Sequence, residues 1–223
     1  MSTALLAMLG MHVLGDYYLQ TDRLAQARQH QFSAVALHSL LYSLAFLPLL
    51  LASHPSAFVV LAVSHALLDA LKFLLQKGTN KTAILFMLDQ LCHILLLVVV
   101  SILYHVTFFL PPSWVSVLRI SVLLLCAAKP VSVMFTELFG RFRPMPGEGT
   151  EGAGKVIGYL ERLILVILMV VGEYGVIGWI IAAKTFARSR QLADSQAFCE
   201  YFLVGTLLSI LSSISLYLVL YRW

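Results

Sequence analysis

Apolar residues fall into seven long runs along the chain, and none of the runs alternates regularly as the strands of a membrane barrel do. The runs cover residues 3–19, 33–52, 57–75, 83–105, 114–135, 156–184 and 197–221. A helix needs about 20 mostly apolar residues to cross a bilayer, and only helices and closed barrels satisfy their backbone there. The pattern therefore predicts an all-α fold, a polytopic transmembrane helical bundle with about seven membrane spans.

The composition agrees with a protein that lies in lipid. Hydrophobic residues make up 60% of the chain and charged residues 12%, with a mean hydropathy of +0.90. A soluble domain carries about 25% charged residues, so the composition excludes a soluble enzyme, a nucleic-acid-binding protein and a disordered linker. The first run has no basic residues ahead of it and contains His12 and Asp16. We interpret it as a retained helix rather than a signal peptide.

The loops between the runs alternate in their basic residues. Loops 20–32, 76–82 and 136–155 carry Lys and Arg, whereas loops 53–56 and 106–113 carry none. Because basic loops stay on the cytoplasmic side, the alternation predicts a multi-pass protein of the bacterial inner (cytoplasmic) membrane with its N-terminus outward.

Two units follow from this layout. Residues 1–110 are predicted to form a four-helix transmembrane unit that bears polar residues, and residues 111–223 a C-terminal transmembrane unit of about three spans. The Pro/Gly-rich stretch 136–155 is predicted to be a cytoplasmic linker.

The run 156–184 has two interpretations. It forms either one long helix or a hairpin that turns at Gly172–Gly175. One helix is the simpler geometry, because each half of a hairpin is shorter than a full span. A hairpin instead returns Lys184 and the basic residues that follow it to the cytoplasmic side.

Seven ionisable residues lie inside the first four runs. They are His12, Asp16, His38, His65, Asp69, Asp89 and His93. Each costs at least roughly 2.5 kcal/mol to place in a membrane helix, so each needs a partner or a function. Six of them form His/Asp pairs four residues apart, which places both side chains on one helix face. Counted from the cytoplasmic ends of the runs, all seven fall within a slab about 10 Å thick.

Imidazole and carboxylate together form a ligand set for a divalent metal ion, most suitably zinc, with iron or manganese as alternatives. We predict all seven residues as metal ligands or their close partners, with Asp16, Asp69 and Asp89 as candidate catalytic bases. Gln20, Lys72 and Gln90 are predicted to support them. A proton relay and a polar network that binds nothing are the competing interpretations.

The pattern His12-x3-Asp16-x3-Gln20, His38, His65-x3-Asp69-x2-Lys72 and Asp89-Gln90-x2-His93 resembles an uncharacterised family of bacterial integral membrane proteins, domain of unknown function 3307. The resemblance covers about the first 110 residues, and the second half resembles the longer members. It implies no activity. A fainter similarity is to bacterial membrane-bound metal-dependent hydrolases, which also place His and Asp in membrane helices.

Three functions are consistent with these residues. The leading hypothesis is a metal-dependent hydrolase of a lipid or prenyl phosphoester or amide, with the site open to the cytoplasm. The alternatives are a transporter for a metal ion or for protons coupled to a solute, and a non-catalytic membrane subunit or sensor. The expected partners are the lipid bilayer and a lipid substrate, with no nucleic acid; the sequence predicts no oligomeric state. The outer halves of the first four runs are mostly apolar, which favours a one-sided site over a conduit.

Overall fold

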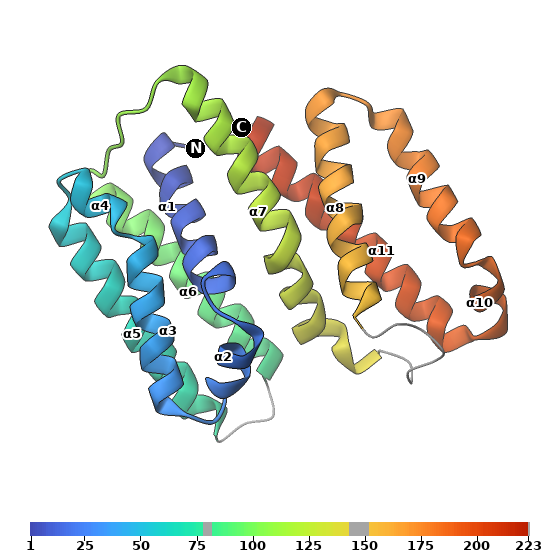
Figure 1. Ribbon diagram of the computed structural model, residues 1–223, viewed down its shortest axis with the longest axis horizontal. Helices are drawn as coiled ribbons and strands as arrows, with labels where there is room; N and C mark the ends of the chain where they lie inside the picture. Colours follow the sequence, from blue (N-terminus) through green and yellow to red (C-terminus); the bar gives the residue numbers. More distant parts are fainter. Residues whose placement is uncertain (78–81, 143–151, 223) are drawn as a thin grey trace. The chain divides into compact units, whose positions relative to one another are not determined.

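The computed structural model describes residues 1–77, 82–142 and 152–222, and these residues form helices, turns and short loops without any strand (Figure 1). The predicted all-α helical bundle is therefore confirmed. The chain divides into two compact units, Met1–Val122 and Leu123–Trp223. The sequence predicts two transmembrane domains that meet at residue 110. The division into compact units does not test that domain boundary, which stays a prediction.

The N-terminal unit is built on four long helical segments that pack side by side. Its elements are α1 (Thr3–Val13), the π-helical turn η1 (Leu14–Tyr18), α2 (Asp22–Ala27), α3 (Phe32–Ala45), α4 (Pro48–Leu51), α5 (Pro55–Gln76), α6 (Thr82–Leu103) and the start of α7 (Pro112–Phe139). Helix α5 packs against both α3 and α6, and α6 also contacts α1. Each helix thus presents one face to the inside of the bundle.

The outer faces of these helices are apolar, as expected of helices surrounded by lipid. Leu40 on α3, Leu67 on α5 and Leu91 on α6 are each more than half exposed. Across the described residues, five helical segments are long and apolar enough to cross a membrane, namely Phe32–Leu51, Pro55–Gln76, Thr82–Leu103, Pro112–Phe139 and Gln196–Arg222. The chain is a membrane protein, and these five segments match five of the seven predicted spans.

An apolar cluster fills one end of the N-terminal unit. Its buried members are Ala4, Met8, Tyr42, Phe46, Leu49, Ala57, Leu61, Leu97, Val100 and Val106. Four of them stand four residues from the histidines of the same helices: Met8 before His12, Tyr42 after His38, Leu61 before His65 and Leu97 after His93. The cluster therefore lies one helical turn beyond the imidazoles on every helix.

The turn η1 approaches α3 so closely that only glycine fits at its second position. A Cβ atom on Gly15 would lie 2.9 Å from Cδ2 of Tyr42 and 3.2 Å from the Tyr42 Cα. We expect Gly15→Ala to lower the free energy of unfolding by about 1–3 kcal/mol, because the added methyl group overpacks this contact. Gly178→Ala is the control, since nothing lies within 4 Å of its added Cβ. Equal unfolding midpoints for the two variants in mixed micelles would contradict the prediction.

The C-terminal unit contains the rest of α7, a 3-10 turn η2 (Gly140–Phe142), α8 (Ala153–Val171), α9 (Tyr174–Ala187), α10 (Ser189–Asp194), α11 (Gln196–Leu216) and the π-helical end η3 (Tyr217–Arg222). Helix α8 packs against α9 and α11. The first residues of the predicted linker 136–155 are helical, because α7 continues to Phe139. Residues 143–151 of that linker lie outside the described residues.

Of the two interpretations of the run 156–184, the structure shows the hairpin and not one long helix. Helix α8 ends at Val171 because Gly172 adopts a left-handed conformation, with φ of +86°. The N–H of Glu173 then donates to the carbonyl of Leu168 at 2.8 Å, which closes the helix end as glycine caps usually do. The chain turns and α9 runs back along α8 (Figure 1). The first predicted span, 3–19, is helical over Thr3–Tyr18, which is shorter than the about 20 residues that a crossing helix needs.

Candidate metal centre

All seven ionisable residues predicted from the first four runs are buried inside the N-terminal unit, with exposed fractions of 0 to 8%. We call them the His/Asp cluster: His12 on α1, Asp16 on η1, His38 on α3, His65 and Asp69 on α5, and Asp89 and His93 on α6. Their imidazole rings gather around His65. The ring centroid of His65 lies 4.6 Å from that of His93 and 5.3 Å from that of His38, and His12 stacks on His93 at 5.5 Å.

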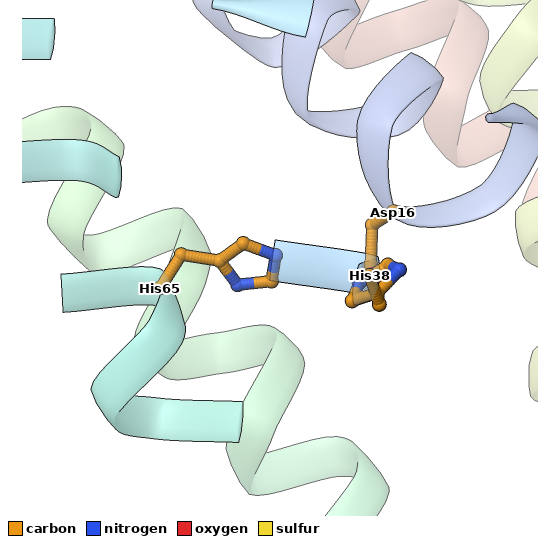
Figure 2. A group of neighbouring side chains, drawn as sticks. All are labelled: Asp16, His38 and His65. Carbon is orange, nitrogen blue, oxygen red and sulfur yellow. The ribbon is translucent and has the colours of Figure 1, made fainter. Parts of the chain in front are cut away.

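Two groups within the cluster have the geometry to hold a metal ion. One is Asp16, His38 and His65, which Figure 2 shows with the His65 ring extending from α5 toward His38 and Asp16. The other is His65, Asp69 and His93. In each group, one ligand atom per residue lies within 4.8 Å of the others.

Three distances between ligand atoms of Asp16, His38, His65 and Asp69 are near the ligand spacing of a tetrahedral site. The Nε2 atom of His38 lies 3.2 Å from Oδ1 of Asp16 and 3.5 Å from Oδ2 of Asp69. The Nε2 atom of His65 lies 3.9 Å from the same Oδ2 of Asp69. Zinc bound at about 2.0–2.2 Å to nitrogen and oxygen separates neighbouring tetrahedral ligands by about 3.3–3.6 Å. We call Asp16, His38, His65 and Asp69 the four-residue site.

A chain of hydrogen bonds links the protonation of His65 to that of His93. Nδ1 of His93 lies 2.8 Å from the backbone carbonyl of Asp89, and because a carbonyl only accepts, His93 donates there. If His93 is neutral, it accepts at Nε2, which lies 2.7 Å from Nδ1 of His65. In that tautomer His65 donates from Nδ1 and keeps a lone pair on Nε2. That lone pair faces the four-residue site, as a metal ligand requires.

The same hydrogen bonds favour the four-residue site over the group that includes His93. Nε2 of His93 is already used as the acceptor for His65. Several buried atoms around the four-residue site make no hydrogen bond, namely Nδ1 of His38, Nε2 of His65 and Oδ1 of Asp69. Buried polar atoms without partners are rare in folded proteins. A bound cation would give Nε2 of His65 its missing partner, so these residues fit a metal ion.

A π-helical turn sets the position of Asp16. The turn η1 covers Leu14–Tyr18 and begins where α1 ends. Such turns insert an extra residue into a helix and occur frequently at functional sites. Asp16 therefore belongs to the group with His38 and His65, whereas His12 lies outside both groups. Nδ1 of His12 is 3.2 Å from the hydroxyl of Tyr42 instead.

Asp89 also lies outside both groups. Its Oδ2 accepts from Lys72 Nζ at 2.8 Å and from Gln90 Nε2 at 3.3 Å. Gln90 also donates to Oδ2 of Asp16 at 2.8 Å, and Gln20 donates to the backbone carbonyl of Asp16. The three residues predicted to support the cluster thus contact its carboxylates or their backbone.

Two residues that the sequence did not single out contact the cluster. Arg28 follows α2, and its Nη2 donates to Oδ2 of Asp69 at 3.0 Å, while Nη1 lies 3.7 Å from Oδ1 of Asp16. Tyr42 is 1% exposed and its ring covers that of His65 at a centroid distance of 3.4 Å. The four-residue spacing from His38 to Tyr42 is a signal that could have found Tyr42. Arg28 was counted only as a loop charge.

A family model described as "Protein of unknown function (DUF3307)" matches residues 4–124, more than half of the chain. The chain belongs to this family. The region that matches DUF3307 contains the whole His/Asp cluster together with Arg28 and Lys72. No curated protein and no solved structure gives a significant match, so these comparisons do not support the fainter similarity to membrane-bound metal-dependent hydrolases.

Proposed function

We propose that this DUF3307 protein holds a divalent metal ion, best matched by zinc with iron or manganese as alternatives, at its four-residue site. The observation that carries the proposal is the approach of Nε2 of His38 and Nε2 of His65 to the carboxylate oxygens of Asp16 and Asp69 in a buried space. In the tautomer that donates from Nδ1 to His93, His65 directs its Nε2 lone pair toward this space. Two imidazoles with two carboxylates are a ligand set that these metals accept.

In this proposal, the metal site is accessible from one end of the four-helix unit and closed at the other. The apolar cluster covers the imidazoles on one side, and Met8, Leu61 and Leu97 are its members next to the histidines. Arg28 and Lys72, the more exposed neighbours of the carboxylates, lie on the other side, with 15% and 18% of their side chains exposed. A transporter needs a polar path through both halves, which this apolar cluster argues against. By the distribution of basic loops, the open end faces the cytoplasm of a bacterial inner membrane and the N-terminus faces outward.

The activity that we infer for such a site is hydrolysis of a lipid or prenyl phosphoester or amide. A bound divalent ion supplies Lewis-acid polarisation of the scissile group and a reactive water. Asp69 is the best-placed base, because its Oδ1 is buried and makes no hydrogen bond, whereas both carboxylate oxygens of Asp16 have neighbours. Water adds to the phosphorus or carbonyl carbon, the bond to the leaving group breaks, and Asp69 passes the water proton to that group.

Metal content tests the proposal. We expect wild-type protein purified in detergent to contain close to stoichiometric zinc, iron or manganese by elemental analysis. His65→Ala and Asp16→Ala should each lose most of it, because each removes a ligand. His30→Ala is the matched control, since it removes an exposed imidazole from the loop after α2.

Folding has to be separated from metal loss, so the helical content of every variant is compared by circular dichroism. A wild-type protein that stays free of metal after reconstitution would overturn the proposed function. Metal that is retained in both folded variants would overturn the assignment to this site. A protein that binds metal but releases no product from lipid phosphoesters or amides would be a non-catalytic subunit or sensor.

A further inference from the structure

The two cations beside the His/Asp cluster are arranged to receive a negatively charged group once a metal ion is bound. Arg28 pairs with Asp69 and Lys72 pairs with Asp89. These side chains are more exposed than the buried histidines, which are 0 to 3% exposed. They therefore stand at the entrance of the site rather than inside it.

A continuous polar chain joins the two cations across the entrance. Arg28 lies beside Asp16, Gln90 donates to Asp16 and to Asp89, and Asp89 accepts from Lys72. Tyr17 holds Gln90 in place by donating its hydroxyl to Oε1 at 2.8 Å.

The charge of the site changes sign when a divalent cation binds. Without metal, the three carboxylates of Asp16, Asp69 and Asp89 outnumber the two cations by one charge. A divalent ion reverses this balance and leaves one net positive charge. The ion also takes over the carboxylate oxygens of Asp16 and Asp69 that Arg28 now contacts. Nη2 of Arg28 then loses its Asp69 partner, while Nη1 keeps its hydrogen bond to Oε1 of Gln20 at 2.9 Å. A guanidinium matches the oxygens of a phosphate in a two-point contact.

We propose that the metal-loaded site binds a phosphate group, held by Arg28 and Lys72, and that phosphoesters rather than amides are its substrates. This inference rests on the proposed metal site. Lys72 stands four residues before the end of α5 at Gln76, and Arg28 follows the short helix α2. Lys72 is thus near the end of one apolar segment and Arg28 lies four residues before another, α3, and lipid headgroups border the ends of membrane-spanning helices. A phosphate on a membrane lipid therefore reaches these residues without leaving the bilayer surface.

The test measures lipid binding with the full-length protein in nanodiscs of phosphatidylcholine, with and without phosphatidic acid. We expect metal-loaded wild type to bind phosphatidic acid, and chelator-treated protein to bind it at least tenfold more weakly. Arg28→Gln and Lys72→Gln should each weaken binding by roughly tenfold or more, because each loses a charged hydrogen bond. Lys77→Gln is the control, since it removes an exposed cation one residue beyond the same helix. Competition by inorganic phosphate distinguishes a free phosphate from a lipid headgroup as the source.

Metal content is measured on the same samples, so the two proposals fail separately. Wild type that contains metal but binds phosphatidic acid no better than phosphatidylcholine would overturn the phosphate inference and leave the metal site standing. The same holds if Arg28→Gln and Lys77→Gln bind equally well. Wild type without metal would overturn both. Arg28→Gln should keep its metal, because the variant removes a competing cation and no ligand.

Discussion

His38→Ala is expected to weaken zinc binding by more than about 100-fold, whereas His12→Ala should weaken it by at most about tenfold. Both variants remove a buried imidazole of the same N-terminal unit. They differ in what the imidazole contacts. Nε2 of His38 lies between the carboxylates of Asp16 and Asp69, at 3.2 and 3.5 Å.

The expected loss for His38 exceeds that of a supporting residue. Replacing a partner of a metal ligand costs about 10–100-fold in affinity, and His38 is itself one of four proposed ligands. His12 instead meets the Tyr42 hydroxyl at Nδ1 and stacks on His93. Its removal leaves the ligand atoms in place and disturbs only their packing.

Zinc dissociation constants, measured by competition with a chromophoric chelator, separate the two variants. His38→Gln is added because it keeps more of the buried volume and preserves the fold if the alanine variant does not. Equal affinities for the folded His12 and His38 variants would contradict the four-residue site. They would instead favour the sequence-level view, in which all seven residues of the His/Asp cluster contribute alike.

Much of the N-terminal unit could be predicted from the sequence because two simple constraints act together. Apolar runs of about 20 residues define membrane helices, and ionisable residues inside them must face the bundle interior. The common depth of His12, His38, His65 and His93 followed from counting residues. A common depth implies that the four histidines are buried together. They are indeed buried, and ring contacts link them.

The division of roles within the cluster could not be predicted in the same way. The spacing of His12 and Asp16 predicts a shared helix face, but the π-helical turn at Leu14–Tyr18 changes the angle between them. Arg28 also escaped notice, since a basic loop residue gives the same signal whether it meets lipid headgroups or folds back onto Asp69. Such contacts depend on loop conformation, which periodicity does not encode.

The fold of the run 156–184 could be predicted only in part from the sequence. Its apolar residues continue through Gly172, so hydropathy alone favoured one helix. The basic residues after it pointed to a hairpin, and the left-handed glycine confirms the break. Glu161 and Lys184, which lie 23 residues apart, meet across this hairpin. One straight helix would have separated them by about 35 Å, at about 1.5 Å per residue.

Lys184→Met is expected to lower the free energy of unfolding by about 3–5 kcal/mol, because it leaves the Glu161 carboxylate buried without its partner. Lys184 Nζ lies 2.5 Å from Oε2 of Glu161 and 3.0 Å from the hydroxyl of Thr206. Glu161 is 7% exposed, and its Oε1 makes no hydrogen bond. The pair therefore joins α8 to α9, and loss of the ammonium group strands a charge inside the C-terminal unit.

Reversible unfolding in mixed micelles, followed by tryptophan fluorescence, measures this effect. Arg190→Met is the matched control, because it removes an exposed cation from α10. The double variant Glu161→Gln/Lys184→Met should recover most of the lost stability, since it removes both charges and a neutral amide costs far less to bury than a carboxylate. If Lys184→Met is no less stable than Arg190→Met, the ion pair does not hold the hairpin together. If the double variant is as unstable as Lys184→Met, the loss comes from packing around the lysine stem and not from the stranded charge.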